Sequence, residues 1–339
     1  MPTHETFDLG PFKSVTRVWC GLWQLSSNAW GSAPVPRIRK CMGEHVDRGF
    51  TAFADHYGSA EIIFGQFRNS VSAPAGKIVG ATKWCVFKTT TPTRSVVEAA
   101  VRERMTRMQT DQVDLLQFHW QDYSDKGYLT ALSHLDDLRS DGLISAIGLC
   151  NFDAIRTDEI CTQLGAGVVV SNQVQFSLID TRPLHGMTDV CQKHNVKLLT
   201  YGTMCGGFLA DRWLDQPEPD LYSGQLTPSQ RKYLDMIVKA WGNWALFQSL
   251  LKTLRTIADR HGDGVSISNI AARWVLDQPC VGAVVIGARL GLSDHLDDNE
   301  SVFSLRLTEK DHAEIERVLE RSNGRRMIMT IGDCGAEYR

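Results

Sequence analysis

Three residues able to move protons stand side by side in the stretch GFTAFADHYGSAE, which covers residues 49–61. Asp55, His56 and Tyr57 follow a short apolar run typical of a buried strand and precede a segment with helical spacing. A tyrosine hydroxyl has an unperturbed pKa of about 10, and a nearby ammonium group lowers that pKa toward the working range. Tyr57 beside a lysine is therefore a candidate general acid.

Further polar residues stand where other apolar runs end. They are Lys83, His119, Asn151, Gln173, Tyr201 and Arg289. Taken singly, each also fits a packing or strand-end role, but ends of parallel strands meet at one face of a closed barrel. Together they suit carbonyl reduction, in which His119 would hydrogen-bond the carbonyl oxygen and Lys83 would support Tyr57. Asn151 and Gln173 would then hold a carboxamide, and Tyr201 would offer a ring for stacking.

The elements that must position these residues alternate along the chain. Short apolar runs such as KIVGATKW, VDLLQFHW and VGAVVIGA predict strands buried on both faces, which is typical of a parallel sheet. Segments such as SVVEAAVRERMTRM carry apolar residues at the three- and four-residue spacing of a helix. Eight strands, each followed by helical sequence, predict one α/β domain over residues 1–339, a (β/α)₈ TIM barrel rather than an open doubly wound sheet.

Two segments exceed what such a barrel needs. The stretch YLDMIVKAWGNWALFQSLLKTLRTIADRHG predicts an extra helix between strands seven and eight. The stretch RMIMTIGDCGAEYR has no helical period, and we expect it to fold back on the barrel or its mouth.

Four aromatic residues are candidate walls of a substrate pocket because they lie in or beside segments that should border the mouth. They are Trp23, Trp30, Trp120 and Tyr123. Core packing is the alternative for Trp23. An aromatic cluster of this kind suits a flat apolar ligand or a cationic intermediate.

The composition limits the classes of molecule that the protein is expected to bind. A formal net charge of −3 gives no basic footprint for nucleic acid or for a membrane surface, so we expect a small-molecule substrate. No basic segment followed by an apolar run opens the chain and no run of 18 apolar residues occurs, from which we infer a cytosolic protein. The nine cysteines form no CxxC pair, which indicates reduced thiols and no metal site. The oligomeric state is open.

The motifs ADHYGSAE, TKW, LLQFHW, IGLCNF, SNQVQFSL, TYGTMCGGFL and VIGARLGLSDHLDDN resemble those of the aldo-keto reductases over nearly the whole chain, and particularly members found in secondary-metabolite pathways. The resemblance implies NADP(H) as cofactor. It matches three members of the catalytic tetrad, namely Tyr57, Lys83 and His119. It also matches nicotinamide contacts at Asn151, Gln173 and Tyr201, and the phosphate and adenosine end at Arg289 and Asn299. Cys150 stands where many members have a serine.

One tetrad member is missing from this resemblance. The family pattern places an aspartate five residues before the tyrosine, where this chain has Ala52. Relatives that the stretch resembles read roughly GFTTFDMADHYGSAE, so the chain looks two residues short and lacks that carboxylate. Asp55 is a candidate substitute, and the alternative is a turn aspartate hydrogen-bonded to the local backbone.

Three functions follow from this pattern. The first is an NADP(H)-dependent reductase of the carbonyl of a bulky, largely apolar metabolite, with Asp55 or water replacing the lost carboxylate. The second keeps the pocket but catalyses a redox-neutral cyclisation, isomerisation or dehydration with Tyr57 and His119. The third is a non-catalytic cofactor-binding protein that signals redox state to a partner.

Overall fold

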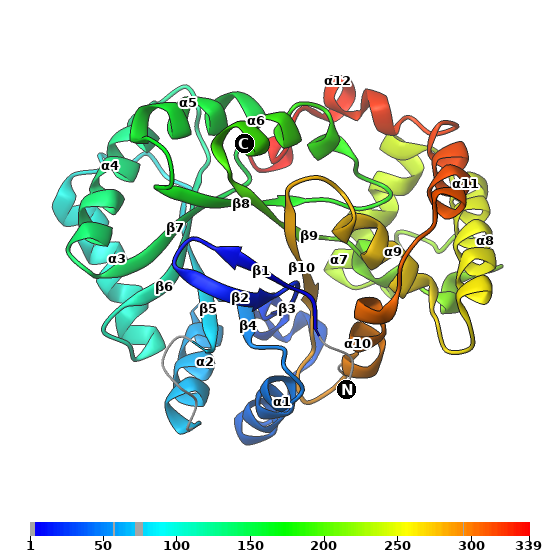
Figure 1. Cartoon of the computed structure of the whole chain (residues 1–339), viewed down its shortest axis with the longest axis horizontal. Helices are drawn as coiled ribbons and strands as arrows, with labels where there is room; N and C mark the ends of the chain where they lie inside the picture. The colour runs from blue at the N-terminus through cyan, green and yellow to red at the C-terminus, as the bar shows by residue number, and fades with distance from the viewer. Residues whose placement is uncertain (1–3, 57, 72–76, 294) are drawn as a thin grey trace.

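The computed structural model describes residues 4–56, 58–71, 77–293 and 295–339. Eight parallel strands close into a barrel in the order β10-β3-β4-β5-β6-β7-β8-β9 (Figure 1). Their bounds are β3 (Val18–Gly21), β4 (Ala52–His56), β5 (Val79–Val86), β6 (Val113–Trp120), β7 (Ile144–Cys150), β8 (Val169–Gln175), β9 (Lys197–Tyr201) and β10 (Val281–Gly287). The predicted (β/α)₈ barrel is confirmed.

Helices surround the strands, as Figure 1 shows. Their bounds are α1 (Val35–Asp47), α2 (Ser59–Ser70), α3 (Arg94–Met108), α4 (Gly127–Ser140), α5 (Ala154–Leu164), α6 (Met187–His194), α7 (Pro228–Asp235), α8 (Trp244–His261), α9 (Ile267–Leu276), α10 (Leu296–Ser304), α11 (Glu309–Leu319) and α12 (Met327–Ile331). A large apolar core lies between the helices and the outer faces of the strands. A smaller one, which includes Trp19, Leu115 and Leu199, fills the barrel interior.

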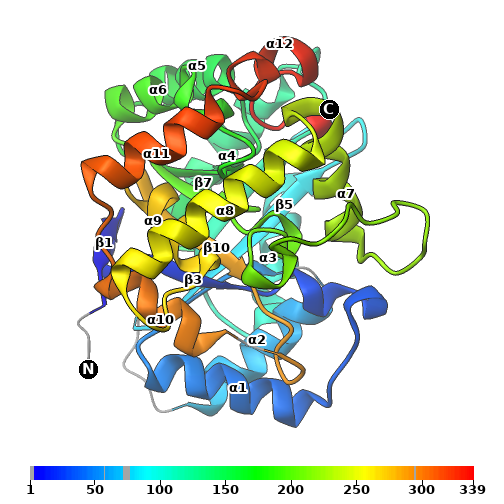
Figure 2. The same ribbon diagram turned by 90° about the vertical axis from the view of Figure 1, so that its right-hand side faces the viewer.

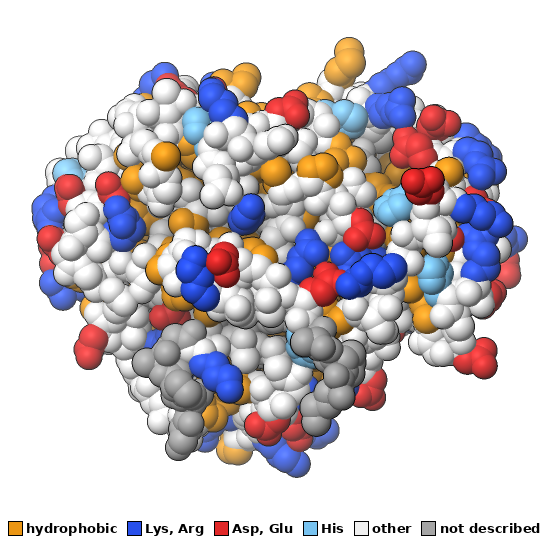
Figure 3. Space-filling model, viewed as in Figure 1, with side chains coloured by type: hydrophobic (Ala, Val, Ile, Leu, Met, Phe, Trp, Pro, Cys, Tyr) orange, Lys and Arg blue, Asp and Glu red, His pale blue; other side chains and the backbone are white. Residues whose placement is uncertain are grey.

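An antiparallel hairpin of β1 (Thr6–Leu9) and β2 (Phe12–Thr16) covers the amino end of the barrel. Figure 2 shows this hairpin and the C-terminal end of the chain on opposite sides of the molecule. The carboxyl ends of the strands, where the predicted site residues stand, therefore open away from the hairpin. In Figure 3, acidic and basic side chains are interspersed on the hairpin side, which shows no field of one sign.

The connection from β9 to β10 holds more than one helix, as predicted. Helix α7 continues into a π-helical turn at Met236–Trp241, and α8 and α9 follow. Thr227 caps α7, because its side chain accepts from the Gln230 N–H while the Gln230 side chain accepts from the Thr227 N–H. Among the described residues, no helix is long and apolar enough to cross a membrane.

The end of the chain folds back over the carboxyl ends of the strands, as expected, but it also contains α12 and a 3₁₀ turn at Ala336–Tyr338. Elements this short span only about one turn, so they leave no period in the sequence. Residues 332–339 are called the mouth segment below.

Strand β4 carries an irregularity close to the suspected two-residue loss. Phe53 pairs with Gly80 and His56 pairs with Thr82, so three steps along β4 match two along β5. An extra residue in one strand of a pair is the signature of a bulge. Ala52, which stands at the family's aspartate position, is buried in the barrel interior. The structure does not test whether a residue pair has been lost.

Candidate active site

His119 lies at the end of β6 on the inner side of the barrel and is almost fully buried. Its Nδ1 stands 3.0 Å from the backbone oxygen of Cys150 at the end of β7. A carbonyl oxygen can only accept, so Nδ1 carries the proton and Nε2 of the neutral ring is an acceptor. In this tautomer Nε2 accepts from a hydroxyl, and the predicted hydrogen bond from His119 to a substrate carbonyl stays a prediction.

Burial keeps His119 neutral. It lowers the pKa from 6.5 to about 4, the charges of Lys83 and Arg339 act in the same direction, and the hydrogen bond to Cys150 opposes them. Below pH 6.5 His119 is protonated in the unfolded chain, whereas in the folded chain it stays neutral until about pH 4. The free energy of unfolding therefore falls as the pH drops through this window.

We expect this single group to cost the wild type about 2–3 kcal/mol of stability between pH 7 and pH 4.5. His119→Gln keeps an N–H donor for the Cys150 carbonyl but cannot titrate, so the variant should lose that much less over the same range. Urea unfolding at both pH values measures the difference between the two proteins. Identical pH dependence would show that His119 titrates normally in the folded state.

Asn151 follows β7 and joins three parts of the mouth. Its backbone has φ +60°, a left-handed conformation that asparagine tolerates better than most residues. The hydroxyl of Tyr201 donates to its Oδ1 at 2.9 Å, and the hydroxyl of Tyr123 donates to its backbone oxygen at 3.3 Å. Asp153 caps α5 two residues later by accepting from the Arg156 N–H. The predicted neighbours Asn151 and Tyr201 are thus in contact.

Gln173, on β8 beside Cys150, is fully buried inside the barrel. Its Oε1 lies 3.9 Å from the Cys150 Sγ, whereas its Nε2 has no hydrogen-bond partner among the residues that the structure describes. A buried donor left without an acceptor costs about 1–3 kcal/mol. The amide therefore offers a donor for an oxygen atom of a bound ligand.

Lys83 also points to the interior of the barrel, where its side chain is 6% exposed. Its Nζ lies 5.9 Å from the centre of the Tyr201 ring, and its charge acts on His119. The structure thus brings Lys83, His119, Asn151, Gln173 and Tyr201 to one end of the barrel. Tyr57 lies outside the described residues, as does the side chain of Asp55, so their predicted roles stay predictions.

The predicted phosphate and adenosine end lies at the loop after β10. Arg289 is exposed, and its Nε donates to the Ser293 hydroxyl at 3.2 Å. Asn299 in α10 lines a small cavity together with Gly287 and His295. A Cβ at Gly287 would lie 2.1 Å from the Gln24 amide nitrogen, so a side chain there would require the Gln24 side chain to move. The structure places both predicted residues near the barrel end.

The predicted aromatic walls divide into two kinds. Trp23 is 42% exposed and its ring lies 4.5 Å from that of Trp30, which excludes core packing for Trp23. Tyr123 stacks on Phe152 beside the mouth. The prediction that Trp120 lines the substrate pocket is wrong, because this residue is 2% exposed and belongs to the core outside the barrel. Outward alternation at the last residue of β6 carries its ring away from the mouth.

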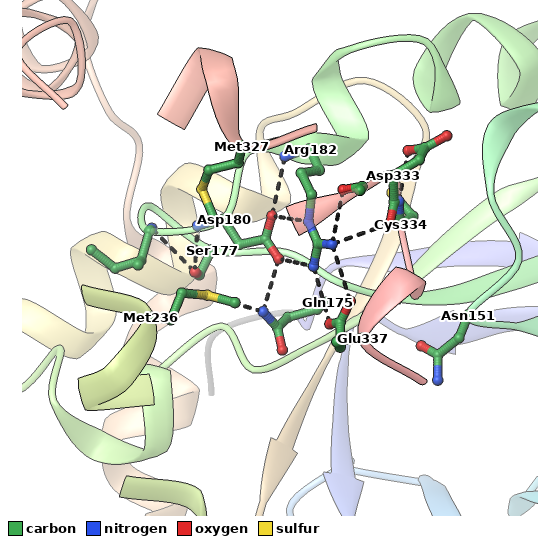
Figure 4. Close-up of polar contacts among 12 residues, drawn as sticks. Asn151, Gln175, Ser177, Asp180, Arg182, Met236, Met327, Asp333, Cys334 and Glu337 are labelled. Carbon is green, nitrogen blue, oxygen red and sulfur yellow. Dashed lines mark hydrogen bonds and ion pairs between the residues drawn. The ribbon is translucent and has the colours of Figure 1, made fainter. Parts of the chain in front are cut away.

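The mouth segment is held by one buried arginine, Arg182, which is 1% exposed (Figure 4). Its guanidinium donates to both carboxylate oxygens of Asp180, both of Glu337, and the backbone oxygens of Gly332 and Asp333. Burial by itself would lower the pKa of Arg182, but the carboxylates of Asp180 and Glu337 raise it above its ordinary value. Because every N–H group of the guanidinium has an acceptor, this ion cluster anchors the segment to the barrel.

Four mouth residues were missed by the sequence reasoning. Phe87, directly after β5, is 61% exposed and its ring lies 5.6 Å from that of His119. Tyr338 meets the His119 ring edge-on, Arg339 donates to the Asn151 oxygen, and Lys232 of α7 donates to the Tyr338 hydroxyl. Only Phe87 had a sequence signal, because it directly follows the strand that carries Lys83.

Several known proteins are similar to this chain in sequence, two of them over most of its length. Aldo-keto reductase YhdN of Bacillus subtilis is 24% identical over 90% of each chain, and chloroplastic pyridoxal reductase of Arabidopsis thaliana is 24% identical over 93% of this chain and 86% of its own. Flagellar radial spoke protein 5 of Chlamydomonas reinhardtii is 31% identical, but the match covers 50% of this chain and 34% of that protein.

Solved structures share the fold. A glycerol dehydrogenase of Gluconobacter oxydans superposes with a TM-score of 0.73 at 23% identity, covering 94% of this chain and 95% of that one. An aldo-keto reductase of Klebsiella pneumoniae in complex with NADPH gives 0.70 at 17% identity over 94% and 95% of the two chains. The sequence model of the Aldo/keto reductase family matches residues 17–320. The chain therefore belongs to the aldo/keto reductase family.

Proposed function

We propose that the protein is an NADP(H)-dependent reductase of the carbonyl group of a bulky, largely apolar metabolite. The observation that carries this proposal is the buried amide of Gln173, whose Nε2 lacks an acceptor among the described residues while it lies in the barrel end that holds Lys83 and His119. A nicotinamide carboxamide oxygen fits that donor. Family membership supports the same cofactor. A role in secondary metabolism and a cytoplasmic location stay predictions.

In this mechanism NADPH, when bound, would supply a hydride to the carbonyl carbon. Gln173 would hold the carboxamide, the Tyr201 ring would support the nicotinamide by stacking, and Arg289 and Asn299 would hold the phosphate and adenosine end. As the C=O double bond breaks, its oxygen takes the proton of the Tyr57 hydroxyl, and the positive charge of Lys83 stabilises the resulting phenolate. His119 would accept through Nε2 from the hydroxyl of the alcohol that forms.

Titration of NADPH fluorescence tests the cofactor. We expect binding below millimolar concentration, and we expect Gln173→Met to weaken it about three- to tenfold, because one hydrogen bond is lost. Gln117→Met is the matched control. This glutamine lies one layer deeper on β6, and its amide also lacks partners within the described structure, so its loss should leave NADPH affinity unchanged. Absence of both NADPH and NADH binding would end the cofactor proposal.

The redox-neutral alternative has one observation in its favour. With Nδ1 committed to the Cys150 carbonyl, Nε2 of His119 is a neutral base at the mouth of the barrel. Because its pKa is lowered to about 4, it is a weak base, which suits an isomerisation or dehydration only of a substrate with an acidic C–H group. Assay of the native substrate with NADPH, with NADP⁺ and without either separates the functions, because only the reductase consumes NADPH in proportion to product.

A further inference from the structure

The ammonium group of Lys232 is enclosed by aromatic rings at the mouth of the barrel. Its Nζ lies 5.7 Å from the centre of the Tyr201 ring, 5.4 Å from that of Tyr233 and 4.7 Å from that of Tyr338. The distances to Tyr201 and Tyr233 are within the range in which a cation is attracted to the face of an aromatic ring. Tyr338 instead meets the ammonium group through its hydroxyl, at the edge of its ring. The two rings and this hydroxyl thus form a half-buried cage around one positive charge.

Among the described residues, this charge has a phenolic partner but no carboxylate partner. Lys232 Nζ donates to the Tyr338 hydroxyl at 2.5 Å, and within the described part of the chain no acidic side chain forms an ion pair with it. Glu337 feels the Lys232 charge but forms its hydrogen bonds with Arg182. Because a partly desolvated ammonium is most stable beside a negative oxygen, the cage is suited to bind one.

The Tyr338 ring already shows which shape fits between Lys232 and the catalytic end. It stands edge-on to His119, with ring centres 6.4 Å apart and an interplanar angle of 86°, while its hydroxyl reaches Lys232. Its neighbours are fixed independently, Glu337 by Arg182 and Arg339 by the Asn151 oxygen. These contacts do not involve the Tyr338 side chain, so they would hold the mouth segment in place if that side chain rotated away.

We propose that this space is a subsite for an aromatic ring of the substrate, and that Lys232 binds a phenolate or carboxylate oxygen on that ring. The Tyr338 side chain fills this space in the structure. The bound ring would lie against His119, which places a carbonyl on its far side at the reacting end of the barrel. That the ligand is a substrate rests on the proposed reductase function, whereas the binding preference does not.

Binding of benzoate and benzamide, which cannot be reduced at a ketone or aldehyde, tests the subsite by itself. The two probes share a shape and differ in charge, so calorimetry on the full chain should show benzoate binding at least tenfold more tightly. Lys232→Met should remove this preference. Lys239→Met is the matched control, because that lysine is exposed and already paired with Asp235, and it should keep the preference. Equal binding of the two probes to the wild type would overturn the proposal.

A second arm separates the subsite from the reaction. With NADPH, wild-type kcat/KM should favour 4-carboxybenzaldehyde over 4-carbamoylbenzaldehyde at least tenfold, and Lys232→Met should make the two nearly equal. If neither aldehyde is reduced but the benzoate preference persists, the subsite stands and the reductase function fails. If Lys232→Met weakens NADPH binding and leaves the benzoate preference intact, Lys232 serves the cofactor and the subsite proposal is wrong.

A third arm tests the occupant. Tyr338→Ala removes the ring that competes for the space, so benzoate should bind several times more tightly to this variant than to the wild type. Weaker binding would make Tyr338 a wall of the pocket and would overturn its role as a replaceable occupant. Circular dichroism confirms that each variant is folded before binding is measured.

Discussion

Replacing Tyr57 by phenylalanine should abolish NADPH-dependent carbonyl reduction, with a loss of about 10²- to 10⁴-fold in kcat, the usual worth of a positioned acid. The substitution keeps the ring and removes only the hydroxyl that would donate the proton. Neither Lys83 nor His119 can replace it readily. His119 is neutral with its one proton committed to the Cys150 carbonyl, and Lys83 is a buried side chain beside Tyr201.

Cofactor affinity separates this loss from a folding defect. NADPH should bind Tyr57→Phe with nearly the wild-type dissociation constant, because the expected nicotinamide contacts come from other strands. Tyr222→Phe is the matched control, since that tyrosine is among the most exposed aromatic residues and should change neither quantity. Full turnover in Tyr57→Phe with any carbonyl substrate would refute the proposed acid, and turnover without cofactor would favour the redox-neutral alternative.

Inserting Asp-Met between Phe53 and Ala54 should raise reductase activity on simple aldehydes at least tenfold. A carboxylate at the family's aspartate position is expected to hold the lysine charged and oriented, which are the two conditions under which it supports a tyrosine acid. Adding two residues preserves the alternation of inward and outward side chains. The pairing of β4 with β5 is already irregular between Phe53 and His56, so the strand can accommodate a change at this point.

The matched control is insertion of Asn-Met at the same place. It has the same length and nearly the same shape as Asp-Met but no charge, so it should fold equally well and leave the rate low. Steady-state kinetics and NADPH titration on both variants measure the effect. If Asp-Met folds, binds NADPH and reacts no faster than Asn-Met, then the missing carboxylate does not limit the rate and Asp55 or water is sufficient.

The barrel and most of the site were predictable because both depend on local patterns. Strands buried on both faces leave continuous apolar runs, and their carboxyl ends leave single polar residues such as His119 and Asn151. Eight such repeats define the fold, and the fold alone brings the polar ends together. The extra helical sequence before β10 was equally visible, since an amphipathic period marks a helix wherever it packs.

Only the tertiary structure decided which nitrogen of His119 carries the proton and which side chains surround the barrel mouth. The tautomer depends on a carbonyl 31 residues away, and the orientation of Trp120 depends on where β6 ends. The segment around Tyr338 is more than a hundred residues from its partners Arg182 and Lys232. Contacts of this kind leave no period in a sequence, because they arise only when the closed barrel and the returning chain place distant side chains together.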